Sequence, residues 1–248
     1  YKSFNKKWSQ LDFLESGKLL NDNLPLFNQN DLIPLNYKKQ EKIRLGFLSA
    51  DIYKKHSVTH FLKTILENYD ENKYEIYLYL NHKLFRKLVK DSSNLIGLKD
   101  IEAINLIRND KIDIMIDLMG VTSKNKLSLI KNRVSPIQIS WCGYCNTTGI
   151  QEMDYLIADP NLILESEKKL YSEKIIFLPK VWNCHVGYNL KKEYIESPSI
   201  KSNKITFGSF NNFNKINSSV IQVWSKILKK VNNSKLILKS SSPLITDK

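Results

Sequence analysis

His56 and His60 are the first residues along the chain whose spacing indicates chemistry, because a helix would place both imidazoles on one face. A zinc metalloprotease needs a glutamate directly after the first histidine, and Ser57 stands there instead. Residues 49–56 follow a predicted strand and precede a predicted helix. An imidazole at such a position can act as a general base or hydrogen-bond to a ligand, or it can cap the helix. His56 is therefore a candidate for acid–base chemistry, with a structural role as the alternative.

Lys215 lies between a predicted strand and a predicted helix, shortly after Asn212. The chain contains neither a Gly-x-Gly-x-x-Gly motif nor a P-loop, so a phosphate would have to be held by a lysine or by a helix N-terminus. Asn217 or Ser218 can cap the helix that follows. The chain also lacks an Asp-x-Asp motif, and with it the metal-clamping carboxylates of one large class of nucleotide-sugar enzymes. Lys215 is thus a candidate phosphate ligand, with an ordinary surface lysine as the alternative.

Cys142 and Cys145 have the spacing of a redox pair, and with Trp141 they match the Trp-Cys-x-x-Cys pattern of thioredoxin-like oxidoreductases. In those enzymes a helix N-terminus acidifies the first thiol, whereas residues 146–150 here are typical of a turn. No second cysteine pair supports a four-thiolate zinc site, since the chain has three cysteines in all. We expect the spacing to be coincidental and keep redox and zinc chemistry as minor alternatives.

The elements that must position these residues alternate between strands and helices, which predicts βαβ units and a mostly parallel sheet. Ligands bind beyond the carboxyl ends of such strands, so the site is expected in the loops after residues 48, 118 and 141. The predicted strands lie at 43–48, 74–80, 112–118, 137–141, 155–158 and 174–178, and the predicted helices at 60–68, 84–89 and 101–108.

A second α/β unit begins after a polar stretch, with strands predicted at 205–210 and 235–238 around a helix at 218–231. One βαβ unit is too little to bury a sheet, so we expect the chain to be a fragment that is truncated inside this unit. The predicted domains are a helical N-terminal segment at 1–40, a lobe at 41–190, a linker at 191–203 and an incomplete second lobe at 204–248.

The 248 residues carry a net charge of +13, with 38 Lys and Arg against 25 Asp and Glu. This charge is typical of nucleic-acid-binding proteins, but the lysines are spread along the chain and form no basic block. We therefore expect a solvated basic exterior and no nucleic-acid partner, with a basic non-catalytic binding module as an alternative. No apolar run approaches the ~20 residues of a membrane span. The chain opens without a signal peptide and has too few cysteines for a disulfide framework, which favours a cytoplasmic protein without a membrane partner.

Several short blocks of this chain, taken in order, resemble the catalytic region of the O-linked N-acetylglucosamine transferases (glycosyltransferase family 41, which includes the SPINDLY-like proteins). Each block is weak alone, but their ordered succession from about residue 40 to 240 is specific. The blocks are Arg-Leu-Gly-Phe-Leu-Ser-Ala-Asp at 44–51 with His56, Asp-Ile-Met-Ile-Asp-Leu-Met-Gly-Val-Thr at 113–122, Arg-Val-Ser-Pro-Ile-Gln at 133–138, Trp-Cys-Gly-Tyr at 141–144 with Thr-Thr-Gly at 147–149, Met-Asp-Tyr at 153–155, Tyr-Ser-Glu-Lys at 171–174, Leu-Pro at 178–179, and Phe-Asn-Asn at 210–212 with Lys-Ile at 215–216.

The resemblance implies a GT-B architecture of two Rossmann-like lobes and an inverting, metal-independent transfer of GlcNAc from UDP-GlcNAc to Ser or Thr of an acceptor protein, without a cofactor. It implies that Lys215 contacts the donor phosphate and that His56 belongs to the catalytic site, with its role as base left open. Gly143, Tyr144 and Asn212 are implied to bind the donor.

The chain departs from the family pattern beside the sugar, where Cys142, Cys145 and Asn146 replace Leu, Pro and Gly, and where Val121 replaces a usual Tyr. These changes leave open an N-linking glucosyltransferase of the same family. Because the later segments of the second lobe lie beyond the sequence, the isolated fragment is expected to bind donor poorly and to turn over negligibly.

Overall fold

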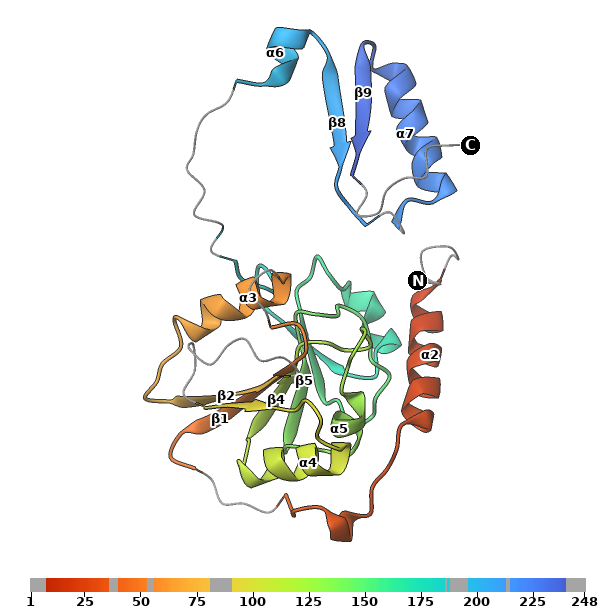
Figure 1. Ribbon diagram of the computed structural model, residues 1–248. Coiled ribbons are helices and arrows are strands. Elements are labelled where there is room, and N and C mark those ends of the chain that lie inside the picture. Colours follow the sequence, from red (N-terminus) through yellow and green to blue (C-terminus); the bar gives the residue numbers. More distant parts are fainter. Residues whose placement is uncertain are drawn as a thin grey trace. The chain divides into compact units, whose positions relative to one another are not determined.

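A computed structural model describes residues 8–35, 40–52, 56–80, 91–185, 187, 196–212 and 215–239. The chain forms two compact units, one made by Ser9–Gly187 and the other containing the described residues from 196 onward. Both are drawn in Figure 1, and each is considered by itself.

The first unit is built on a seven-stranded parallel sheet with the order β3-β2-β1-β4-β5-β6-β7. The sequence runs outward from β1 in one direction and from β4 in the other, so the topological switch point lies between these two strands. The α/β class predicted from the alternating pattern is confirmed. The strands are β1 (Ile43–Ser49), β2 (Tyr74–Leu80), β3 (Asp91–Asn94), β4 (Ile114–Asp117), β5 (Ile137–Ser140), β6 (Tyr155–Ala158) and β7 (Lys174–Phe177).

Helices cover both faces of this sheet and bury two separate apolar clusters. On one face, Val58 and Leu62 of α3 pack with Phe47 of β1. On the other face, residues of α4 and α5 pack with Leu48 and Met115. This division follows from the strand period of two, which turns neighbouring residues of β1 to opposite faces. The helical elements of the unit are α2 (Gln10–Asn23), η1 (Gln29–Asp31), α3 (Ser57–Leu66), α4 (Asp100–Asn109), α5 (Leu127–Lys131) and η2 (Glu165–Leu170).

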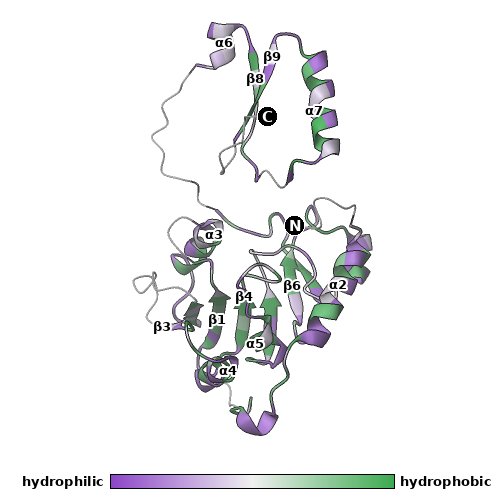
Figure 2. Ribbon diagram, turned by 45° about the vertical axis from the view of Figure 1, so that its right-hand side comes forward, coloured by the Kyte–Doolittle hydropathy of each residue, from purple (hydrophilic) through white to green (hydrophobic). Residues whose placement is uncertain are grey.

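The second unit contains α6 (Pro198–Ser202), β8 (Ile205–Ser209), α7 (Ser218–Lys230) and β9 (Ser234–Leu238). β8 and β9 pair in parallel, which makes the predicted βαβ unit. Figure 2 shows hydrophobic and hydrophilic residues alternating along α7, as in an amphipathic helix. The short helix α6 lies in the segment interpreted as a linker, where Pro198 at the first helical position favours a helix start.

Two further expectations concern helices of this chain. The helix predicted at 84–89 lies outside the described residues. Within the part of the chain that the structure describes, no helix has the length and apolar composition that a membrane crossing requires.

Candidate functional site

The loops predicted to carry the site follow β1, β4 and β5, and these three strands are neighbours in the sheet. Because all strand pairs are parallel, the three loops leave the same edge of the sheet. The first two flank the switch point, where ligands of open α/β sheets bind. The predicted position of the site is therefore supported by the strand order.

His56 lies after β1 and caps helix α3. Its Nδ1 atom accepts a hydrogen bond from the backbone N–H of Val58 at 3.4 Å. Its Nε2 atom lies 3.9 Å from Oδ1 of Asp51, and the two side chains are 29% and 27% exposed. An imidazole held in this way can take or give a proton only through Nε2, which the solvent can reach. The structural role considered for His56 is thus confirmed, because its Nδ1 atom caps α3.

His60 lies one turn further along α3. Its ring centroid is 5.8 Å from that of His185, whose ring also stands edge-on to Phe61 at 5.6 Å. Within the described ranges, no group of three or more His, Cys, Asp or Glu side chains is placed to hold a metal ion. The zinc reading of the histidine and cysteine spacings therefore gains no support from these residues.

Asp117 ends β4 and organises the loop that follows. Its Oδ1 accepts a hydrogen bond from the N–H of Met119 at 3.3 Å, and its Oδ2 accepts one from the N–H of Gly120 at 2.7 Å. The side chain is buried, and the loss of hydration raises its pKa to about 7 although both N–H groups act in the opposite direction. The Asp117 carboxyl thus fixes the backbone of residues 119 and 120, and Gly120 there faces the loop after β5.

Gly120 and Gly143 allow the loops after β4 and β5 to interlock. Gly120 has a φ of +53°, and a Cβ atom there would lie 2.5 Å from Cβ of Tyr144. A Cβ atom on Gly143 would overlap the carbonyl oxygen of Leu118. Only glycine tolerates both the conformation and the approach. Tyr144 is therefore fixed against the loop after β4, and its burial raises the pKa of its hydroxyl to about 12.

Cys142 precedes this contact and does not have the environment of a redox cysteine. It follows a strand, and burial raises the pKa of its thiol to about 12, with a further increase from the nearby Cys184. The thiol is therefore protonated at neutral pH, the opposite of an acidified nucleophile. Cys142, Cys145 and Cys184 are all free. These observations argue against the oxidoreductase alternative.

Glu173, just before β7, holds the far end of the loop after β5. The carboxylate is buried and accepts hydrogen bonds from the hydroxyl of Thr147 at 2.8 Å, the backbone N–H of Thr148 at 2.7 Å and the hydroxyl of Thr148 at 2.5 Å. Ser172 joins the cluster through its backbone N–H, which donates to the hydroxyl of Thr147. A buried carboxylate with this many donors is satisfied and rigid.

Lys215 and Asn212 lie in the second unit, in the turn between β8 and α7. The backbone N–H of Lys215 donates to the carbonyl of Asn212 at 3.0 Å, and both side chains are exposed. Asn217 caps α7 by accepting from the N–H of Val220 at 3.0 Å, which confirms the first of the two predicted caps. A lysine directly before a helix N-terminus puts a formal charge beside the positive end of the helix dipole, an arrangement suited to an anion.

The structure thus brings the predicted site residues together in two sets. His56, Gly143 and Tyr144 belong to the unit Ser9–Gly187, and Asn212 and Lys215 belong to the other unit. The sequence pattern assigned no role to Asp117, Gly120 or Glu173. For Asp117 the available signal is its place at the carboxyl end of an apolar strand, whereas nothing near Glu173 in the sequence indicates that it contacts a loop 25 residues away.

Comparisons with known proteins give a consistent result. The family model "Glycosyl transferase family 41" matches residues 24–191. The chain is 34% identical over 216 residues to the probable UDP-N-acetylglucosamine–peptide N-acetylglucosaminyltransferase SPINDLY of Arabidopsis thaliana, covering 82% of this chain and 24% of the relative. It is 35% identical over 206 residues to the SPINDLY protein of Oryza sativa, covering 79% and 22%. The chain thus spans about a quarter of the length of these relatives.

Among solved structures, the chain is similar to a variant of the O-GlcNAc transferase of Thermobaculum terrenum. The TM-score is 0.80 at 27% sequence identity, and the match covers 94% of this chain and 45% of that one. The GT-B type of α/β fold expected from the sequence is confirmed by this likeness.

Proposed function

The chain belongs to glycosyltransferase family 41, and we propose that the protein containing it transfers GlcNAc from UDP-GlcNAc to serine or threonine hydroxyls of acceptor proteins. The observation that carries the proposal is the match over about four-fifths of the chain to relatives named as UDP-N-acetylglucosamine–peptide N-acetylglucosaminyltransferases. The family model matches residues 24–191, which include all three loops of the site. The residues beside Tyr144 that depart from the family pattern border the proposed sugar site, so the test below includes a second donor.

In the proposed reaction, the acceptor oxygen attacks the anomeric carbon from the side opposite to UDP. The bond between that carbon and the β-phosphate oxygen breaks, and its electron pair leaves with UDP. The hydroxyl proton must pass to a base or to water. We propose that Nε2 of His56 takes part in this step, since Nδ1 accepts the N–H of Val58 and Nε2 lies on the side of Asp51. We assign His56 to the site on this geometry, and its role as the base is open to test by a pH profile.

Negative charge grows on the β-phosphate as UDP leaves, and a fixed cation there lowers the barrier. We propose that Lys215 supplies this charge, supported by its place before the capped N-terminus of α7. Asn212, whose carbonyl holds the Lys215 backbone, is proposed to contact the donor from the same turn. With this cation in place, the reaction needs neither a metal nor another cofactor.

The sugar is proposed to lie against Gly143 and Tyr144. The supporting observation is their fixed position, because the close approach of Gly120 and Gly143 to the neighbouring loop restricts the conformation of this turn, where both residues are partly exposed. A preformed wall of this kind lowers the entropy cost of binding. A cytoplasmic location is proposed as well, supported by three free cysteines, which a reducing compartment preserves.

The function is tested with the full-length protein, UDP-GlcNAc and a mixture of candidate acceptor proteins, with and without EDTA. We expect a mass increment of one N-acetylhexosamine on serine or threonine, unchanged by EDTA. Incorporation of hexose on asparagine from UDP-glucose would instead support the N-linking alternative. An absence of transfer from both donors, with intact folding, would contradict the proposal. Salt-sensitive nucleic-acid binding without affinity for UDP would indicate the basic binding module.

A further inference from the structure

Helix α2 lies outside the part of the chain that the family model matches, yet it packs on the loop that carries Gly143 and Tyr144. The match begins at residue 24, and α2 ends at Asn23. In both Figure 1 and Figure 2 this helix runs along the outside of the first unit. Ser9 and Asp12 start it with a reciprocal capping box, so its N-terminal end is defined by local sequence.

The contact centres on two glycines. A Cβ atom on Gly17, in the middle of α2, would lie 2.6 Å from the carbonyl oxygen of Thr148 and 2.8 Å from Cα of Gly149. In turn, a Cβ atom on Gly149 would overlap the backbone of Gly17. Glycine inside a helix is about 1 kcal/mol less favourable than alanine, so its place here is explained by this close approach of two backbones.

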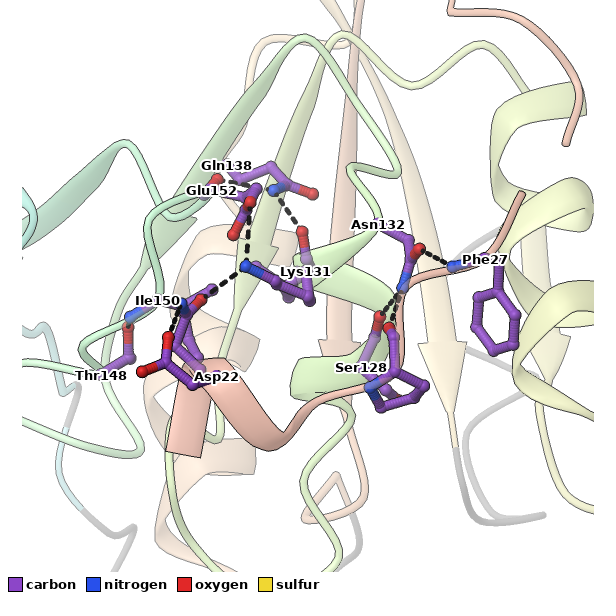
Figure 3. Close-up of polar contacts among 12 residues, drawn as sticks. Asp22, Phe27, Ser128, Lys131, Asn132, Gln138, Thr148, Ile150 and Glu152 are labelled. Atoms are coloured by element: carbon purple, nitrogen blue, oxygen red, sulfur yellow. Dashed lines mark hydrogen bonds and ion pairs between the residues drawn. The ribbon is translucent and has the colours of Figure 1, made fainter. Parts of the chain in front are cut away.

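Polar contacts fix the helix on both sides of this crossing. Near its start, the side-chain amide of Gln10 donates to Oδ1 of Asn146 at 2.5 Å. Near its end, the ammonium group of the buried Lys131 donates to Oδ1 of Asn21 at 2.9 Å and pairs with Glu152 at 3.3 Å. Figure 3 shows this lysine between the end of α2 and Glu152.

The segment that follows α2 is held as firmly. Asn132 accepts from the backbone N–H of Phe27 at 2.8 Å and donates to the carbonyl oxygens of Pro25 and Ser128, each at 2.8 Å (Figure 3). The side chain is buried and its amide is satisfied by these partners. The helix therefore cannot slide along the loop without breaking contacts at both of its ends.

From the other side, the same loop is held by Glu173, which binds Thr147 and Thr148. The loop is thus clamped between a helix that precedes the matched domain and a carboxylate near the end of that domain. Its other end is the Gly143–Tyr144 turn, which packs closely against the loop after β4. A displacement at Gly149 is transmitted to this turn through only a few residues.

We propose that Gly17 is a positioning residue for the donor site, and that α2 sets the place of Gly143 and Tyr144 by its contact with Gly149. The donor-binding part of this inference rests on the proposed function. A displacement of about 1 Å at a reacting centre can cost ~10²-fold in rate.

The test compares Gly17→Ala with Ser16→Ala in the full-length protein, because Ser16 is the exposed neighbour in the same helix. We expect Gly17→Ala to raise KM for UDP-GlcNAc about tenfold or more, which corresponds to ~1.4 kcal/mol, and to leave KM for the acceptor unchanged. Amide hydrogen exchange in residues 142–150 should increase in the same variant. Ser16→Ala should change neither quantity. Alanine has a higher helix propensity than glycine, so a raised KM or increased exchange in Gly17→Ala would have to come from the contact with Gly149.

Each outcome bears on a different statement. If the wild type transfers GlcNAc and Gly17→Ala keeps both its donor KM and its exchange pattern, the inference is overturned. If the wild type transfers nothing, the proposed function fails, and hydrogen exchange alone decides whether Gly17 positions the loop. If Gly17→Ala does not fold, Gln10→Ala replaces it as the milder variant, with increased exchange at Asn146 and Thr147 expected and unchanged exchange contradicting the inference.

Discussion

Asp117 gives the prediction that follows most directly from the structure, because its carboxyl group is buried and its pKa is raised to about 7 by the loss of hydration. In the unfolded chain the pKa returns to about 3.8. Between these values the folded state binds more protons than the unfolded state. The free energy of unfolding must therefore fall as pH rises from about 4 through 7, as ionisation becomes costly in the fold.

The magnitude follows from the two pKa values. Linkage over the range from pH 5 to pH 8 gives a loss of roughly 2–3 kcal/mol from this one group. Asn has nearly the shape of the carboxyl and cannot ionise. Its NH2 group would face one of the two N–H donors and lower the stability, but this loss does not change with pH. We expect the free energy of unfolding of Asp117→Asn to lack this part of the pH dependence.

The assay is urea denaturation of the wild type and Asp117→Asn at several pH values between 5 and 8. The wild type should lose roughly 2–3 kcal/mol more than the variant across this range. Only the difference between the two slopes is needed, so contributions of other groups cancel. Parallel slopes would refute the reasoning, because they would mean that Asp117 ionises in the fold as easily as in water.

Three further substitutions test the loops around the site. Gly120→Ala should lower the midpoint of thermal unfolding, because φ is +53° there and the new Cβ would meet Tyr144; an unchanged midpoint would show that the loops can separate. Glu173→Gln should destabilise the chain by ~1–3 kcal/mol in urea denaturation, because its NH2 group would face either the Thr147 hydroxyl or the Thr148 N–H and hydroxyl, all of which donate to the carboxylate; equal stability would mean that the cluster is not formed. Cys145→Ser should retain full transfer activity in the full-length protein, and a loss of transfer in the folded variant would instead support thiol chemistry.

The sheet could largely be predicted from the sequence because its central strands are continuous apolar runs, as buried parallel strands require. β2 and β6 lie at the residues predicted for them. β3 was missed since it reads Asp-Ser-Ser-Asn, and an edge strand with one hydrogen-bonded neighbour needs little apolar surface. α6 was missed because five residues are too few to establish a helical period.

For the site, the predicted strand ends gave the positions of the loops, but not the contacts between one loop and the next. The contact of Gly17 with Gly149 joins residues more than 130 positions apart, and each glycine alone is typical of an ordinary break or turn. A capping role was one of the alternatives predicted for His56, but the helix was predicted from residue 60, whereas α3 begins at Ser57 directly after this residue. The burial of Asp117 depends on the packing of three loops, which a single sequence does not encode in any local pattern.

The central claim is that this chain supplies the catalytic lobe and the phosphate-binding turn of a UDP-GlcNAc transferase. It is tested most directly by turnover of UDP-GlcNAc in the full-length protein, with the wild type beside Lys215→Ala and the control Lys226→Ala, an exposed lysine of α7. We expect Lys215→Ala to reduce turnover by roughly 10²-fold or more, as removal of a group that stabilises developing negative charge does, while Lys226→Ala keeps wild-type turnover. Equal turnover in all three proteins, or none in the wild type, would contradict the account.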